Sequence, residues 1–171
     1  MISPNNYVML FVATSLFGLV GRPGQAAPVR DERSSLEAAY SAMDAAAAHR
    51  DVEKVLSYDS PDYKATSING QVYDLAKQRR VTQMTLGTAE RASSTTEIKQ
   101  VKLSGQIAVV VAKRHYDFTM AILDPDTGKH DRFVCDMLVR DTWYCEGQRW
   151  LRRSTQMLSY KEARNGRTNQ H

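Results

Sequence analysis

The sequence predicts an α+β domain in which three N-terminal helices pack on a strongly curved antiparallel sheet. Apolar residues recur at helical spacing between about residues 34 and 86. From Ser94 onward the period changes to two, and short turn sequences separate long alternating segments. Helices followed by a run of antiparallel strands are typical of an α+β domain. Long twisted strands curl, so we expect a hollow that the helices only partly close.

The N-terminal segment, residues 1–26, is expected to be a signal peptide that is removed from the mature protein. Residues Tyr7 to Val20 form an uncharged apolar run that is too short to span about 30 Å of hydrocarbon comfortably. Small residues at Gly24 and Ala26 fit cleavage after Ala26, which predicts a secreted or periplasmic protein. No Lys or Arg precedes the apolar run, so an uncleaved membrane anchor is the alternative.

One domain is expected at residues 34–159, after a linker at 27–33 and before a flexible, polar and basic tail at 160–171. The chain has 171 residues, of which 42% are apolar and 25% charged, and this composition excludes a collagen-like or low-complexity protein. The net charge is +4 and falls to +3 when Arg22 is lost with the leader. We therefore expect no nucleic-acid partner and, after cleavage, no association with a membrane.

Capping patterns define where the helices begin. Ser34 and Glu37 form a capping box in front of a helix that reaches about His49. Asp51 is expected to cap a second, short helix, and Asp74 is expected to cap a third.

Turn sequences divide the rest of the domain into strands. Asn69-Gly70 is expected to connect two short strands, because both residues of such a turn must accept a positive φ. The turns at Ser104-Gly105, Asp124–Gly128 and Glu146-Gly147 then separate four long antiparallel strands. The last of these strands is expected at Arg149–Leu158.

Short segments between about Leu36 and Met157 resemble one protein family. These segments are His49–Val52, Asp62-Tyr63, Asn69–Gln71, Asp141–Trp143 and Gly147–Leu151. Their order and spacing resemble the nuclear transport factor 2-like superfamily, in its SnoaL-like and ketosteroid-isomerase-like branch. The resemblance implies a cone-shaped, cystatin-like α+β roll around a pocket, and frequently a homodimer through the outer face of the sheet. The superfamily includes isomerases, cyclases and dehydratases, as well as members with no known activity.

Ketosteroid isomerases need a carboxylate base and an oxyanion hole formed by a tyrosine and a protonated aspartate. The resemblance places the tyrosine position on Met43 and the base position on Ser67. Neither residue can take the role, because a thioether donates no hydrogen bond and an alcohol is a poor base. Tyr40 lies about one helical turn away and could substitute for the tyrosine. Asp117 and Asp136 fall on polar strand faces, so no inward acid is expected and no catalytic residue is assigned.

Arg114 interrupts an apolar stripe on the second long strand. It either reaches solvent past Tyr116 or lies at the mouth of a pocket, where it would bind an anionic or carbonyl group. Trp143 and Trp150 are expected mainly in the core, with a ligand contact as the alternative. The candidate ligand-binding residues are Tyr40, Met43, Tyr63, Arg114, Tyr116, Phe118 and Trp150.

No disulfide, metal site or cofactor is expected. On one extended strand Cys135 and Cys145 would lie about 33 Å apart, whereas a disulfide needs Cα atoms within about 7 Å. We therefore expect free thiols, with Cys135 buried and Cys145 near a hairpin tip. The four histidines are scattered and lack the spacing of a metal site.

Three functions fit these features. The favoured one is an exported domain that binds a small hydrophobic or carbonyl-containing ligand, or another molecule, without established catalysis. The second is an isomerase, lyase or cyclase that uses Tyr and Arg side chains of the pocket. The third is a homodimerisation module whose cavity is blocked by Met43, Met137 and the tryptophans. An acid that points into the cavity near Tyr40 would favour the enzyme.

Overall fold

The structure is a computed structural model that describes residues 32–125 and 127–170. Its helices are α1 (Glu32–Ala48), α2 (Val52–Leu56) and α3 (Leu75–Thr85). Its strands are β1 (Asp59–Thr66), β2 (Val72–Asp74), β3 (Ala89–Ser104), β4 (Ile107–Leu123), β5 (His130–Glu146), β6 (Arg149–Arg164) and β7 (Arg167–Gln170). The expected signal peptide lies outside the described residues, and the last two residues of the expected linker belong to α1.

Two of the three predicted helix caps are confirmed. Asp51 and Asp74 each accept a hydrogen bond from the backbone N–H three residues later, at 2.9 Å and 2.7 Å. The predicted capping box is wrong, because α1 already includes the residues before Ser34, and Glu37 pairs with Arg33 at 3.0 Å. Among the described residues, no helix is long and apolar enough to cross a membrane.

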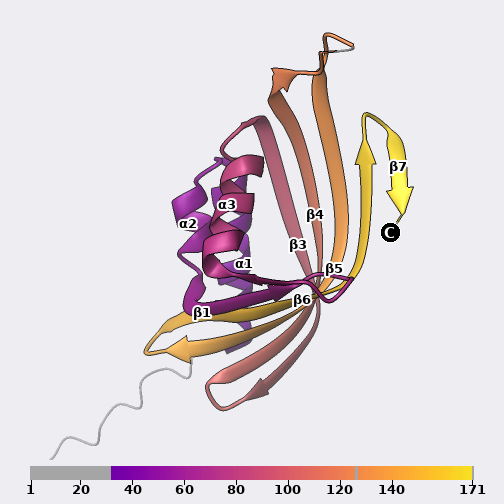
Figure 1. Ribbon diagram of the computed structural model, residues 1–171. Coiled ribbons are helices and arrows are strands. Elements are labelled where there is room, and N and C mark those ends of the chain that lie inside the picture. Colours follow the sequence, from indigo (N-terminus) through magenta and orange to yellow (C-terminus); the bar gives the residue numbers. More distant parts are fainter. Residues whose placement is uncertain (1–31, 126, 171) are drawn as a thin grey trace, which may run out of the picture.

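The strands form one sheet in the order β2-β1-β6-β5-β4-β3, and β7 pairs with β6. The four long strands pair antiparallel in sequence order, as predicted, and only β1 and β6 run parallel among the described strands. Figure 1 shows the sheet curled around the helices, which lie on the inner side of the bend. The predicted α+β class, with three helices on a curved sheet, is confirmed.

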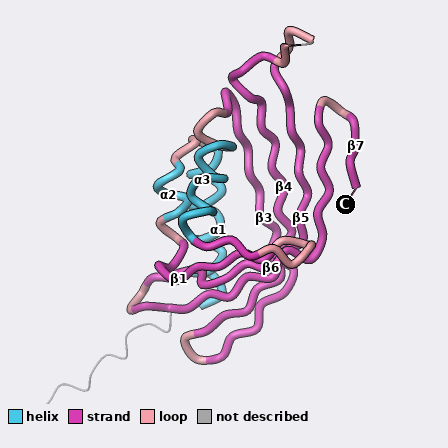
Figure 2. The backbone as a smooth tube through the Cα atoms, in the orientation of Figure 1, coloured by secondary structure: helices cyan, strands magenta, loops and turns pink. Residues whose placement is uncertain are grey.

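Irregular pairing helps the long strands to bend. The register of β3 against β4 shifts between Ile98 and Gln100, and that of β5 against β6 shifts at Leu138/Val139 and Thr142/Trp143. A bulge of this kind bends its strand and increases the local twist. Figure 2 shows the long strands bending toward the helices along their length. The curvature encloses a hollow between the sheet and the helices.

The hydrophobic core lies between α1 and the inner face of β4 and β5. Its buried members are Leu36, Ala39, Tyr40, Met43, Ala108, Val110, Ala112, Val139, Trp143 and Trp150. The expectation that Trp143 and Trp150 belong to the core is thus confirmed. Alanines on α1 and on β4 belong to this core, and the strand whose backbone lies closest to α1 is β3.

The C-terminal segment differs from the prediction. The last long strand continues to Arg164 instead of ending at Leu158, and β7 pairs with it from Lys161 onward. Most of the residues expected to form a flexible tail are therefore held in strands. The turn between β6 and β7 is Asn165-Gly166, whose φ angles of 51° and 80° are both positive.

Candidate functional site

A cavity of about 450 Å³ lies between the helices and the inner face of the curled sheet. Residues of all three helices and of strands β1 to β6 line it. Six residues singled out from the sequence are among them: Tyr40, Met43, Tyr63, Arg114, Tyr116 and Phe118. Further apolar wall residues include Leu86, Met137, Val139 and Met157. The methionines therefore line an open volume and do not block it.

The prediction that Trp150, the seventh candidate, lines this cavity is wrong. It faces the first turns of α1, where its indole Nε1 donates a hydrogen bond to Ser35 Oγ at 2.8 Å. The cavity instead begins one turn further along α1, at Tyr40. Trp150 is therefore a core residue at the N-terminal end of α1, away from the cavity.

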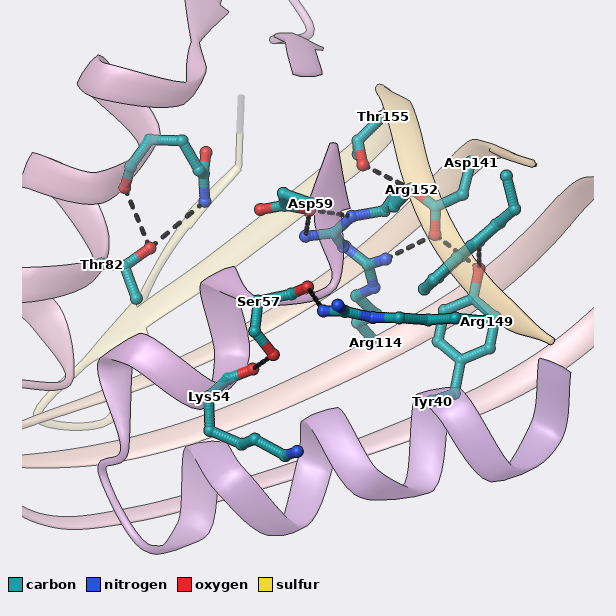
Figure 3. A network of polar contacts seen from close by, with 12 residues as sticks. Tyr40, Lys54, Ser57, Asp59, Thr82, Arg114, Asp141, Arg149, Arg152 and Thr155 are labelled. Carbon is teal, nitrogen blue, oxygen red and sulfur yellow. Dashed lines mark hydrogen bonds and ion pairs between the residues drawn. The ribbon is translucent and has the colours of Figure 1, made fainter. Parts of the chain in front are cut away.

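Asp141 of β5 lies at the centre of a buried hydrogen-bond network beside the cavity (Figure 3). Its Oδ2 accepts hydrogen bonds from Tyr40 Oη at 2.6 Å and from an Nη of Arg114. Its Oδ1 accepts from Thr155 Oγ1 at 2.6 Å. Tyr40 Oη also accepts from Trp143 Nε1 at 2.8 Å. The network joins α1, β4, β5 and β6, and both oxygens of Asp141 have partners.

A second buried ion pair lies next to the first (Figure 3). Arg152 of β6 contacts Asp59 Oδ1 of β1 through Nε at 2.8 Å and Nη2 at 2.7 Å. Its guanidinium carbon lies 5.1 Å from the centre of the Tyr63 ring. Asp59 Oδ2 is buried and has no hydrogen-bond partner among the described residues. The parallel pairing of β1 with β6 brings this pair together, because it aligns Asp59 with Arg152.

Burial and pairing together set the charges of these groups. Burial alone lowers the pKa of Arg114, but the adjacent Asp141 carboxylate outweighs it and holds that pKa above its usual range. The pKa of Arg152 is raised in the same way by Asp59. Burial raises the pKa of Asp59, which its contact with Arg152 partly offsets. Burial and the charge of Asp141 also raise the pKa of Tyr40. Both guanidinium groups are therefore charged and Tyr40 is protonated at neutral pH.

The two arginines keep N–H groups that can reach the cavity. Asp141 occupies one terminal nitrogen of Arg114, and no other described residue hydrogen-bonds its guanidinium. Asp59 occupies Nε and Nη2 of Arg152, and Nη1 has no partner among the described residues. Both side chains line the cavity, and none of these spare nitrogens is fully buried. The cavity thus offers fixed, charged hydrogen-bond donors on one side.

The acid beside Tyr40 does not form a ketosteroid-isomerase site. Asp141 is within hydrogen-bond reach of Tyr40, but it does not line the cavity and its oxygens are occupied. The Tyr40 hydroxyl donates its proton to Asp141 and so does not offer it to a ligand. Met43 and Ser67 both line the cavity, and the Ser67 hydroxyl donates to Asn69 Oδ1 at 2.5 Å in the β1–β2 turn. The expected base and oxyanion positions therefore hold groups without that chemistry.

Four charged residues of the site were not found from the sequence: Asp44, Asp59, Asp141 and Arg152. Asp141 could have been found, because it alternates with Val139 and Trp143 on the inward side of β5. The expectation that no strand carries an inward acid is therefore wrong. The pairing of Asp59 with Arg152 had no local signal, because 93 positions separate the two residues.

The two cysteines are free thiols in the structure. Cys135 is half-buried instead of buried and lines the cavity, and burial raises the pKa of its thiol. Cys145 lies beside the β5–β6 turn, as predicted. No group of three or more His, Cys, Asp or Glu residues in the described part of the chain could hold a metal ion.

No family model and no curated protein matches this sequence. Several solved structures with the same architecture do match it. A candidate scytalone dehydratase from Novosphingobium aromaticivorans matches with a TM-score of 0.63 at 11% identity, over 75% of this chain and 85% of that one. A candidate dehydratase of the nuclear transport factor 2-like family from Streptomyces avermitilis matches with a TM-score of 0.60 at 12% identity, over 74% and 94%. The chain has the nuclear transport factor 2-like fold.

A third structure with this fold is a nuclear transport factor 2-like protein of unknown function from Shewanella oneidensis. It matches with a TM-score of 0.55 at 13% identity, over 74% of this chain and 98% of that one. The resemblance read from the sequence is confirmed as a nuclear transport factor 2-like fold. The fold carries both enzymes and proteins without known activity, so function must be argued from the cavity itself.

Proposed function

We propose that this protein binds a small molecule that has an apolar body and an uncharged hydrogen-bond acceptor, such as a carbonyl oxygen. The observation that carries the proposal is the placement of two buried guanidinium groups, Arg114 and Arg152, at the edge of a cavity with largely apolar walls. A volume of about 450 Å³ is within the usual range of small-molecule sites.

Charge balance favours an uncharged acceptor over a carboxylate. Arg114 is already paired with Asp141, and Arg152 with Asp59. A ligand carboxylate would therefore add an unbalanced negative charge to a buried site. An uncompensated buried charge costs on the order of several kcal/mol. A carbonyl oxygen accepts from the spare N–H groups without that cost. The apolar walls then stabilise the ligand body by about 25 cal/mol per Å² of apolar surface buried.

A dehydratase-type enzyme is the second candidate function. Two structures with the same fold are candidate dehydratases. Asp44 is a carboxylate on the cavity wall and supplies a base that such chemistry would need. Loss of water from the bound molecule during incubation with the protein would favour this candidate over a binding function.

The proposal is tested by expressing the full chain with its leader and isolating the exported form. We expect native mass spectrometry to detect the protein with a small molecule bound, and extraction to yield a compound with a carbonyl or similar acceptor. N-terminal sequencing of the same preparation checks export, because cleavage after Ala26 gives a chain that begins at Ala27. A chain that retains Met1 would contradict the predicted cleavage and leave the cavity proposal unchanged.

A cavity-filling variant provides the matched control. Ala65 lines the cavity, whereas Ala121 is exposed on β4. We expect Ala65→Phe to abolish retention of the molecule and Ala121→Phe to retain it. If the wild-type protein carries nothing and no apolar ketone raises its melting temperature, the binding function is wrong.

A further inference from the structure

Asp44 places a carboxylate on the wall of the cavity. It lies on α1, one residue after the buried Met43, and its side chain is half-buried. Ser94 Oγ and Thr96 Oγ1 of β3 donate hydrogen bonds to it at 2.6 Å and 3.0 Å. These two donors fix the side chain between the helix and the sheet.

Both of these hydrogen bonds end on the same oxygen, Oδ1. No described residue hydrogen-bonds Oδ2, and no Lys, Arg or His in the described part of the chain forms an ion pair with Asp44. Oδ2 is also not among the fully buried atoms that lack a partner. A half-buried carboxylate beside apolar walls thus keeps one oxygen that can accept a further hydrogen bond.

The position of Asp44 relative to Arg114 follows from the strand register. Thr96 of β3 is aligned with Arg114 of β4, and Ser94 is aligned with Tyr116. Aligned residues on antiparallel strands have Cβ atoms about 4.5–5.5 Å apart. Thr96, which holds the Asp44 carboxylate, is therefore the direct neighbour of Arg114 on the inner face of the sheet. Asp44 and Arg114 line the same cavity, so the cavity has both a hydrogen-bond acceptor and a hydrogen-bond donor in its wall.

We propose that Asp44 recognises a hydroxyl or other hydrogen-bond donor on the ligand, while the arginine side of the cavity binds its carbonyl oxygen. The ligand class is then an apolar compound that carries both a carbonyl acceptor and a hydroxyl donor. This inference rests on the proposed function, because it assigns a second recognition residue to the same cavity. Two hydroxyl donors on Oδ1 stabilise the carboxylate and orient Oδ2 toward the ligand.

Three matched ketones test the inference: benzylacetone, its para-hydroxy derivative raspberry ketone, and the para-methoxy derivative anisylacetone. They share a methyl ketone and a phenyl ring, and only raspberry ketone donates a hydrogen bond. Dissociation constants are measured by NMR chemical-shift titration. We expect raspberry ketone to bind the wild-type protein about tenfold more tightly than the other two, as a charge-assisted hydrogen bond predicts.

Variants assign this preference to Asp44. Asp44→Asn keeps an oxygen for Ser94 and Thr96 but removes the charge, and we expect the preference to fall below about twofold. Thr96→Val, which removes one of the two positioning hydrogen bonds, is expected to give an intermediate preference. Glu37→Gln, on an exposed part of the same helix, is the control and should keep the wild-type preference.

The outcomes separate this inference from the proposed function. Equal binding of the three ketones to the wild-type protein overturns the role of Asp44 and leaves the cavity proposal intact. A preference for raspberry ketone that persists in Asp44→Asn also overturns it, because another residue then recognises the hydroxyl. If none of the ketones binds and the exported protein carries no small molecule, the proposed function itself fails.

Discussion

At the scale of single residues, Asp141 connects the buried network beside the cavity. It is fully buried and pairs with Arg114 while also accepting from Tyr40 and Thr155. Removing one partner of a buried ion pair leaves an uncompensated charge, which lowers the free energy of unfolding by about 3–5 kcal/mol. We expect Asp141→Ala to lower the free energy of unfolding by about this amount. Urea unfolding followed by circular dichroism measures it.

A double variant distinguishes the buried charge from lost packing. With Arg114→Met and Asp141→Leu together, no charge remains unpaired, so the loss should be clearly smaller than for Asp141→Ala. Asp117→Ala removes an exposed pair with Arg132 and should cost under about 1 kcal/mol. Equal losses for the single and double variants would show that packing, and not the charge of Arg114, explains the effect.

The residues of the site could be predicted only in part. Arg114 was found because a cation interrupts an apolar stripe, and such a residue needs either solvent or a buried partner. Its partner could not be identified, because Arg114 is aligned with Met137 and pairs with Asp141, which lies four residues further along the neighbouring strand β5. Asp44 was missed because a polar residue on a helix gives no sign of which element faces it.

At the scale of elements, local signals in the sequence predicted two of the three helix caps and the first hairpin. The Asp51 and Asp74 caps and the hairpin at Asn69-Gly70 depend on a few neighbouring residues, and both caps and the hairpin are confirmed. The expected turn geometry is wrong, because the loop spans residues 67–71 and only Gly70 of the pair has a positive φ. Asn165-Gly166 carries the same hairpin signal, but it was overlooked within a polar and basic segment. The parallel pair of β1 and β6 had no local signal, because it joins segments far apart in the sequence.

The β6–β7 hairpin is held by Asp131, whose stabilising effect depends on pH. Asp131 accepts hydrogen bonds from Arg164 and from Asn165 Nδ2, the latter at 2.6 Å. The Arg164 and Asn165 hydrogen bonds hold the pKa of Asp131 below its usual range. A lowered folded pKa gives stability that is present above the ordinary value of about 4 and is lost as the pH falls through the lowered value. We therefore expect amide protection in residues 161–170 to decrease below about pH 4.

Hydrogen exchange, corrected for intrinsic rates, measures this effect. Asp131→Asn should lower protection of the hairpin at neutral pH and remove most of its dependence on acid. Asp62→Asn is the control, because Asp62 also has a lowered pKa but pairs with Arg153 elsewhere in the sheet. Unchanged protection at acidic pH would mean that backbone pairing alone holds the hairpin.

At the scale of the whole molecule, the curvature of the sheet explains how a chain with few large aliphatic side chains folds. The core between α1 and the inner face of the sheet uses small side chains, such as Ala39, Ala108 and Ala112, and the sheet strand closest to α1 is β3. Beyond this core, the curled sheet and the helices enclose a cavity of about 450 Å³ instead of a solid core. The composition and strand lengths predicted the hollow, but its lining depended on bulges and register that the sequence does not specify locally.

The outer face of the same sheet leads to the last prediction, that the protein is a homodimer. Val109 and Val111 of β4 point away from the core, and Leu138 of β5 is aligned with Lys113 on that face.

We expect light scattering to give the mass of two chains at a protein concentration of tens of micromolar, which is on the order of the dissociation constants of common dimers. Val111→Arg should shift the mass to one chain, because it would place a second cation directly opposite Arg140 within the interface. Ile122→Arg, at the highly exposed end of β4, is the control and should remain dimeric. A wild-type mass of one chain at this concentration would contradict association through the sheet.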